Sequence, residues 1–158
     1  MIKRRICNLF TETMNKKEAF AYFGIKQTNE RWSWSGISAN KDLVVLTIWS
    51  DQKKFNKQTK TFQTSTFNQN NEMWINDLGN KERIELIQYC IDNLDSKFRA
   101  IFATPTNPGV IDETRDWKKG MPYDKQWFKL TKFNSRTGEF ESESFHDNDS
   151  NIPKIEVL

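Results

Sequence analysis

Tryptophan is concentrated between residues 31 and 49 of this chain, and any fold must find a place for these large rings. Trp32 and Trp34 alternate with serines in the segment Arg31-Trp32-Ser33-Trp34-Ser35-Gly36, and Trp49 closes the apolar run 43–49. Tryptophan is costly to leave in water, and it stacks with a specific geometry when it lines a site. The rings therefore either build the core of one β-hairpin or line a pocket for a flat ligand.

The composition indicates one globular domain with a core rich in aromatic rings. The chain has 158 residues, 36% of them hydrophobic and 13% aromatic, so rings supply much of the apolar material. A chain of this length is about the size of one domain. The net charge of +3 and the pI near 8.8 permit nucleic-acid binding without requiring it.

Several kinds of chemistry are disfavoured by what the chain lacks. It has two cysteines, Cys7 and Cys90, and no CxxC or Cys/His cluster, which argues against a zinc site. Its one histidine, His146, is expected to be a plain surface residue, which argues against a histidine-dependent triad. Neither a signal peptide nor an apolar run of membrane-spanning length is recognised. We expect a soluble cytoplasmic protein without cofactor, metal or membrane contact, and a binding module rather than an enzyme.

Hydrophobic periodicity and end signals predict two helices and a larger number of strands. The first helix, 16–23, begins after Asn15, which forms a capping-box pattern with Glu18, and ends before Gly24. The second helix, 81–93, carries isoleucines at helical spacing. Strands are predicted from alternation or from continuous apolar runs. They span residues 31–38, 43–50, 59–67, 97–103, 126–133 and 139–145, with a further short strand considered at 110–117.

The order of these elements favours an α+β fold. Most connections resemble hairpins, and the regular alternation of strand and helix that a doubly wound parallel fold needs is absent. We expect a strongly curved, mixed or antiparallel sheet, or a small open barrel, flanked by two helices. One domain is expected over residues 1–147, followed by a polar tail at 148–158 that is disordered at its end.

The tryptophans beside polar residues suggest a site for a nucleobase. Aromatic rings stack on bases with about 1–3 kcal/mol each, whatever the base. Flat apolar walls, a few polar groups and positive charge together recognise a flipped nucleotide. The alternative for Trp34 and Trp49 is a place in the core, where large rings dominate the energetics. The proposed roles are stacking or pocket walls for Trp32, Trp34 and Trp49, polar contacts for Ser33 and Asp51, and a phosphate contact for Arg31.

The segment 117–127 supplies a second combination of rings and positive charge. Trp117 is followed by Lys118 and Lys119, and a turn-rich stretch through residue 123 precedes Trp127. We predict a nucleic-acid-binding loop at 118–123 in which Lys118 and Lys119 contact phosphates, with Trp117 beside it as a further ring of the site. The alternative is a solvated loop with one docked tryptophan, because surface loops are commonly polar.

A weaker pattern suggests a metal-dependent nuclease. Asp42 precedes the apolar strand, and Asp51 and Lys53 follow it. Nucleases with an acidic residue, a strand and an acidic-x-Lys triplet hold Mg²⁺ between their carboxylates in this manner. The alternative is that Asp42 caps a turn and Lys53 is solvated. A motif match without its structural context is only a hypothesis.

Two motifs of this chain have a distinctive amino-acid sequence. They are Phe23-Gly24-Ile25-x-x-Thr28-Asn29-x-Arg31-Trp32-Ser33-Trp34-Ser35 and Val44-Val45-Leu46-Thr47-Ile48-Trp49-x-Asp51. With a helix near 82–91 and the apolar strand after it, they resemble a domain of bacterial proteins that include some HNH-type restriction endonucleases. The resemblance covers most of residues 20–145. The Cys pair and the His-Asn-His set of an HNH nuclease are missing, so the resemblance implies DNA recognition or targeting beside a nuclease partner protein, not cleavage.

A looser similarity connects the expected fold with the PUA-like readers of modified bases, the EVE, YTH and SRA groups. It rests on architecture and aromatic content alone. The first hypothesis is therefore a DNA-binding module that reads a modified or flipped base in restriction or another defence system. The alternatives are a metal-dependent nuclease that uses Asp42, Asp51 and Lys53, and an anti-defence module of a phage or mobile element that binds a host protein.

Overall fold

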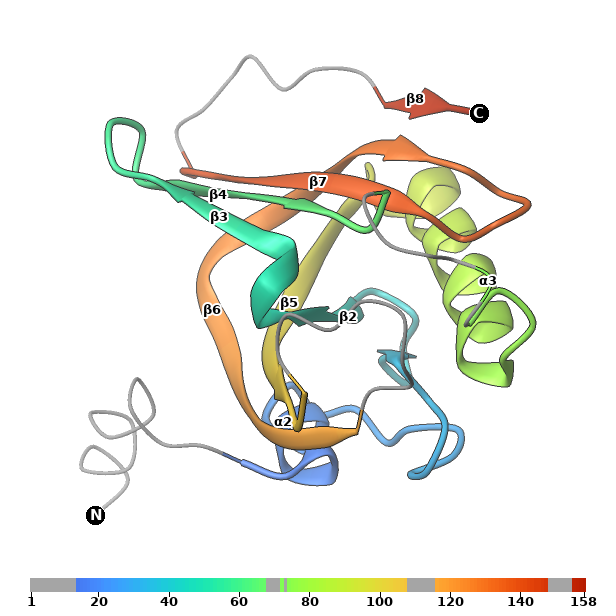
Figure 1. Cartoon of the computed structure of the whole chain (residues 1–158). Helices are drawn as coiled ribbons and strands as arrows, with labels where there is room; N and C mark the ends of the chain where they lie inside the picture. Colours follow the sequence, from blue (N-terminus) through green and yellow to red (C-terminus); the bar gives the residue numbers. More distant parts are fainter. Residues whose placement is uncertain (1–13, 68–71, 73, 108–115, 148–154) are drawn as a thin grey trace.

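The computed structural model describes residues 14–67, 72, 74–107, 116–147 and 155–158. Within these residues the chain forms an eight-stranded sheet and two α-helices (Figure 1). The α+β class predicted from the sequence is therefore confirmed. Most of the short strand considered at 110–117 lies outside the described residues. The helices are α2 (Lys16–Tyr22) and α3 (Leu78–Asn93), with one 3-10 turn, η1 (Ser50–Gln52).

The sheet is mixed, as expected, because two of its strand pairs are parallel. Its strands are β1 (Ser35–Ile37), β2 (Val44–Trp49), β3 (Lys53–Asn56), β4 (Thr61–Ser65), β5 (Lys97–Pro105), β6 (Trp117–Phe133), β7 (Phe140–Phe145) and β8 (Glu156–Val157). They follow the order β1-β2-β5-β6-β7-β4-β3, and β8 pairs with β6 beside this path. The parallel pairs are β2 with β5 and β6 with β8. The end strands β1 and β3 do not pair, so the curved sheet stays open (Figure 1).

The continuous apolar run of β2 is explained by cover on both faces of the sheet. Successive side chains of a strand point to opposite faces. Leu46 and its even-numbered neighbours in β2 join the larger core, to which α3 contributes Ile87 and Cys90. Val45 joins a smaller core, to which α2 contributes Ala19 and Phe20. The two helices therefore cover opposite faces of the sheet.

Phenylalanine supplies five of the twelve buried residues of the larger core, in line with the ring-rich composition. Phe98 and Phe128 stack at a centroid distance of 5.5 Å, and both are fully buried. Phe140 meets Phe98 edge-on, and Phe102 meets Phe128 in the same manner. Offset and edge-on arrangements are the ones that aromatic quadrupoles favour.

The predicted start and end of α2 are confirmed. Asn15 Oδ1 accepts a hydrogen bond from the Glu18 amide, and Glu18 Oε1 accepts one from the Asn15 amide. Gly24 follows the helix with φ +73°, a conformation that costs glycine little. The second helix begins at Leu78, three residues before its predicted start. Neither helix of the described part has the length and apolar character that a membrane crossing requires.

The predicted strand 31–38 is wrong over its first half. The strand spans Ser35–Ile37, and the Thr47 amide of β2 also donates to the Trp34 carbonyl oxygen, whereas Arg31 and Trp32 lie in a turn. The cause is Asn29, whose side-chain oxygen accepts hydrogen bonds from the amides of Arg31 and Trp32. Such Asx turns compete with strand pairing for backbone donors. The hairpin of β1 with β2 itself is confirmed.

The predicted loop at 118–123 is also wrong, because these residues belong to β6. Lys119 pairs with Thr104 of β5, and Gly120 pairs with Ala103. Glycine at position 120 permits the close approach of Trp117, whose ring lies directly over it. The strand β3 was not predicted. It forms a hairpin with β4, and β4 falls inside the predicted strand 59–67.

The last residues of the predicted polar tail form β8. Glu156 and Val157 pair in parallel with Lys132 and Phe133 of β6, and Ile155 packs against the larger core. The segment 148–154, which carries the rest of the expected tail, lies outside the described residues.

A wide bulge in β6 ties the sheet to α2. Between two register points, one residue of β5, Arg99, faces four residues of β6. Its guanidinium lies 3.8 Å from the centroid of the Trp127 ring, and Nη1 donates to the Asp124 carbonyl oxygen at 3.0 Å. The Tyr22 hydroxyl of α2 donates to the Asp124 carboxylate.

Titration of Tyr22 is expected to report on its hydrogen bond with Asp124. The hydrogen bond to Asp124, with a smaller contribution from burial, raises the pKa of Tyr22 from 10.0 to about 12. Because the pKa is raised in the folded state, the contact stabilises the fold fully below pH 10 and is lost as the pH rises towards 12. Tyrosinate absorbance of the wild type should show a late component that is reduced in Tyr22→Phe and shifts to lower pH in Asp124→Asn, while Tyr123, whose pKa is also raised by burial, keeps its own part. An unchanged late component in Tyr22→Phe would contradict the assignment.

Candidate functional site

Five of the six tryptophans lie at one end of the sheet. The parallel strands β2 and β5 end side by side, with Trp49 opposite Ala103, and β6 begins at the same edge with Trp117 opposite Pro105. In open α/β sheets, ligands bind outside the carboxyl ends of parallel strands. We call this region the tryptophan end. Its rings are all partly buried and come from four separate segments: Trp32, Trp34, Trp49, Trp74 and Trp117.

The first ring pair of the tryptophan end consists of Trp49 and Trp117. Their centroids are 6.5 Å apart with an interplanar angle of 60°. A hydrogen bond holds the Trp117 ring in place, since its Nε1 donates to the Met14 carbonyl oxygen at 3.1 Å. Lys118 and Lys119 follow it on β6 with exposed side chains. The structure thus places four of the predicted site residues next to one another.

The second ring pair surrounds a buried arginine, which the sequence analysis missed. Trp34 and Trp74 meet edge-on at 6.3 Å, and the Arg83 guanidinium lies 5.1 Å and 5.0 Å from their centroids. It also lies 5.3 Å from the Phe140 ring. Arg83 is only 5% exposed, and burial lowers its pKa to about 10. We call this group the Arg83 cage.

In the residues that the structure describes, aromatic rings rather than a carboxylate surround the Arg83 guanidinium. Buried charges are normally paired, and a guanidinium over aromatic faces gains about 2 kcal/mol or more when it is desolvated. Among the described residues, the one side-chain acceptor that Arg83 reaches is Asn80 Oδ1, at 3.1 Å. Asn80 is itself fixed, because its amide donates to the carbonyls of Ile75 and Thr137. One face of Trp34 is therefore occupied by the protein itself.

The other predicted site residues of the segment 31–34 differ in how far they are exposed. Ser33 is fully buried, and its hydroxyl accepts a hydrogen bond from the Asn29 amide at 3.0 Å. This contact gives Ser33 a part in the turn at 29–33. Arg31 is exposed and Trp32 is partly buried. Arg31 and Trp32 therefore remain accessible at the tryptophan end, whereas Ser33 does not.

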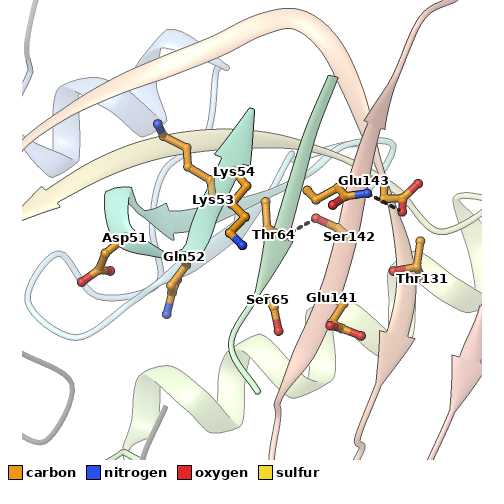
Figure 2. A pocket seen from close by; sticks show the side chains of 11 residues that line it. Asp51, Gln52, Lys53, Lys54, Thr64, Ser65, Thr131, Glu141, Ser142 and Glu143 are labelled. Carbon is orange, nitrogen blue, oxygen red and sulfur yellow. Dashed lines mark hydrogen bonds between the residues drawn. The ribbon is translucent and has the colours of Figure 1, made fainter. Parts of the chain in front are cut away.

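A hollow of about 440 Å³ lies beyond Trp49 (Figure 2). One wall is formed by residues 51–54 of η1 and β3, the middle by residues 63–65 of β4, and the other wall by residues 141–143 of β7 with Thr131. All of these side chains are polar or charged, so the hollow has no aromatic wall among the described residues. The predicted site residue Asp51 borders it. The hollow is therefore not the ring-walled pocket that the sequence predicts.

The three residues of the nuclease hypothesis are not brought together. Asp42 lies before β2 and Asp51 after it, at opposite ends of a six-residue strand that is about 20 Å long. Asp42 caps a turn, since its carboxylate accepts a hydrogen bond from the Ser38 hydroxyl at 2.7 Å. Lys53 directs its amino group over the Phe62 and Phe102 rings. Across the described ranges, no group of three or more His, Cys, Asp and Glu residues is placed to hold a metal ion.

His146 is better connected than a plain surface residue. Its Nδ1 lies 3.1 Å from the Gln126 side-chain nitrogen, and its Nε2 lies 2.8 Å from the Thr59 carbonyl oxygen. An accepting Nδ1 and a donating Nε2 satisfy both contacts. His146 is exposed, as expected, but it also links the β6 bulge to the turn between β3 and β4.

Arg83 had a signal that sequence reasoning could have used. It precedes Ile87 by four residues and Cys90 by seven, so it stands on the buried stripe of its helix. A cation on such a stripe needs a partner inside the fold. Trp74 gave no comparable signal, because it lies outside a regular element.

Comparison of this chain with protein-family models, with curated proteins and with solved structures finds no match.

Proposed function

We propose that this protein is a nucleic-acid-binding module that uses the tryptophan end to stack on bases. The observation that carries the proposal is the half-buried pair of Trp49 and Trp117 directly beside the exposed Lys118 and Lys119. Aromatic rings next to cations are the elements with which proteins bind exposed bases and their phosphates. Arg31 and Trp32 lie at the same end of the sheet, on the segment that leads into β1.

The geometry favours a smaller site than the sequence indicates. Trp34 has one face against Arg83 and Ser33 is enclosed in a turn, so neither belongs to the proposed binding surface. The open curved sheet with one helix on each face supports the likeness to PUA-like base readers at the level of architecture. We further propose DNA with a modified or flipped base as the ligand, in restriction or another defence system, on the strength of the sequence resemblance.

Removal of the two lysines should weaken binding in a salt-dependent way. Lys118→Ala/Lys119→Ala is expected to bind a labelled single-stranded oligonucleotide about tenfold more weakly at about 50 mM salt, because two phosphate contacts are lost. The slope of log K against log salt should fall by about 1.4 to 1.8, since each contact contributes about 0.7 to 0.9. Fluorescence anisotropy at several salt concentrations measures both quantities.

A second double variant with the same net charge as Lys118→Ala/Lys119→Ala provides the control. Lys26→Ala/Lys57→Ala removes two exposed lysines outside β6 and should change affinity and slope little. Equal losses of affinity in the two double variants would mean that the positive charge of the protein attracts the oligonucleotide without a defined binding site. No binding of any single-stranded or duplex oligonucleotide by the wild type would refute the proposal and favour a protein ligand.

A further inference from the structure

In the hollow beyond Trp49, a positive and a negative wall lie on the two sides of strand β4. Lys54 of β3, Gln63 of β4 and Glu143 of β7 are register partners in one row across the sheet. Ser65 and Glu141 are partners in the next row. Neighbouring strands are about 4.8 Å apart, so the backbones of β3 and β7, which carry the lysine and the glutamates, are separated by about 10 Å. Figure 2 shows the strand β4 between the two walls.

These charges are not neutralised by each other. Within the described part of the chain, the one ion pair shorter than 4.0 Å joins Lys17 and Glu30, far from the hollow in sequence. Gln63 Nε2 donates to Glu143 Oε1 at 3.4 Å, which leaves most of that carboxylate's acceptor capacity unused. Lys54 has an exposed side chain.

The nearest cations on the far side of β7 belong to β6. Lys129 is the register partner of Glu143, and Lys132 is the partner of Glu141. Lys132 places its amino group 4.7 Å from the centroid of the Phe67 ring. Neither lysine approaches a carboxylate to ion-pair distance among the described residues, so the glutamate wall keeps its capacity to accept hydrogen bonds.

A nucleotide with an amino-bearing base matches this arrangement. Its phosphate requires a cation, its exocyclic amine donates to carboxylates, and the two groups are about 10 Å or less apart. Glutamate and aspartate accept from the cytosine amine in known base recognition. A volume of about 440 Å³ lies within the range of small-molecule sites.

We propose that the hollow binds one nucleotide through its exocyclic amine, with the phosphate at Lys54 and the amine at Glu141 and Glu143. The inference rests on the proposed nucleic-acid function, and it names the part of the ligand that is read. Asp51 connects the two sites, because it borders the hollow and lies two residues after Trp49. A strand stacked at the tryptophan end would thus deliver its next nucleotide to the hollow.

CMP and UMP provide a matched pair of probes, because they share sugar and phosphate and differ in the amine or carbonyl at C4 and in the protonation of the neighbouring N3. Two-dimensional NMR titration of the full chain should show amide shifts at residues 51–54, 63–65 and 141–143, with CMP bound at least about tenfold more tightly than UMP. Glu141→Ala/Glu143→Ala should abolish this preference. Lys54→Ala should weaken the binding of both nucleotides equally.

Exposed residues elsewhere serve as controls. Glu85→Ala on α3 and Lys57→Ala in the turn after β3 should leave both affinities unchanged. Equal binding of CMP and UMP by the wild type, or a preference that survives in Glu141→Ala/Glu143→Ala, would overturn the inference. Oligonucleotide binding that depends on Lys118 and Lys119 would in that case still support the proposed function. CMP preference without oligonucleotide binding would support the hollow and refute the wider function.

Discussion

Replacement of Arg83 by alanine is expected to lower the free energy of unfolding by about 3 kcal/mol. The variant loses the contacts of the guanidinium with Trp34, Trp74 and Phe140, and it leaves a cavity in a region that is almost fully buried. A desolvated guanidinium over aromatic faces gains about 2 kcal/mol or more, and large-to-small changes in a core add a cavity term. Urea denaturation of the two proteins measures the difference.

Two further variants separate charge from packing in the Arg83 cage. Arg83→Met keeps most of the volume without the charge, and it should recover part of the loss because an apolar chain is not penalised by burial. Lys81→Ala removes an exposed cation from the same helix and should change the free energy of unfolding by no more than about 0.5 kcal/mol. A loss below about 1 kcal/mol in Arg83→Ala would contradict the role of the Arg83 cage.

Replacement of Gly79 by alanine is expected to destabilise the protein by about 2 kcal/mol. In an ordinary exposed helix this change stabilises by about 1 kcal/mol, because glycine is a poor helix former. Here a methyl group would meet the Trp32 carbonyl oxygen and would lie 2.6 Å from the Trp34 ring. Overpacking of this kind typically costs about 1–3 kcal/mol, so the sign of the effect should reverse.

A double-mutant cycle tests the cause of this reversal. In a Trp34→Leu background, Gly79→Ala should cost less than in the wild type, because the smaller side chain leaves room for the methyl group. Thermal or urea unfolding of the four proteins gives the coupling energy. Additive effects of the two substitutions would show that contact with the Trp34 ring is not the source of the cost.

The parts of the fold that follow local rules were predictable from the sequence. The capping box at Asn15 fixes the start of α2, and the apolar run of β2 requires cover on both faces. The hairpin of β6 and β7 was visible in the turn at 134–138 and the alternation around it. In each case the signal and the structure lie within a few residues, so no distant contact has to be known.

The parts that depend on distant contacts were not predictable. The segment 118–123 reads as a loop because of its lysines, glycine and proline, yet it pairs with β5 along its length. The half-strand at 31–34 was misread because the side chain of Asn29 takes the backbone donors that a strand would use. Charge and turn propensity are weak evidence when a neighbouring strand can satisfy the backbone.

The candidate site was predictable in its residue types but not in its grouping. Trp34 and Trp49 are close in sequence, yet they belong to different ring pairs, one with Trp74 and one with Trp117. Which rings meet is decided by the parallel pairing of β2 with β5 and by the position of α3, and both involve residues far away in the chain. Arg31, Asp51, Lys118 and Lys119 are exposed as their predicted roles require, and the rings of Trp32, Trp49 and Trp117 are partly exposed, whereas Ser33 is buried.

The most direct test of the proposed function is titration of the tryptophan emission with short single-stranded and duplex oligonucleotides, unmodified and with N6-methyladenine or 5-methylcytosine, at about 50 mM salt. Stacking of a base on the Trp49 and Trp117 pair should quench the emission, and the quench should be smaller in Trp117→Phe that remains folded, because Trp49 alone is then left to report it. Stronger quenching by one modified oligonucleotide would identify the base that is read. Binding without any quench, or an equal quench in the wild type and Trp117→Phe, would contradict base stacking at the tryptophan end.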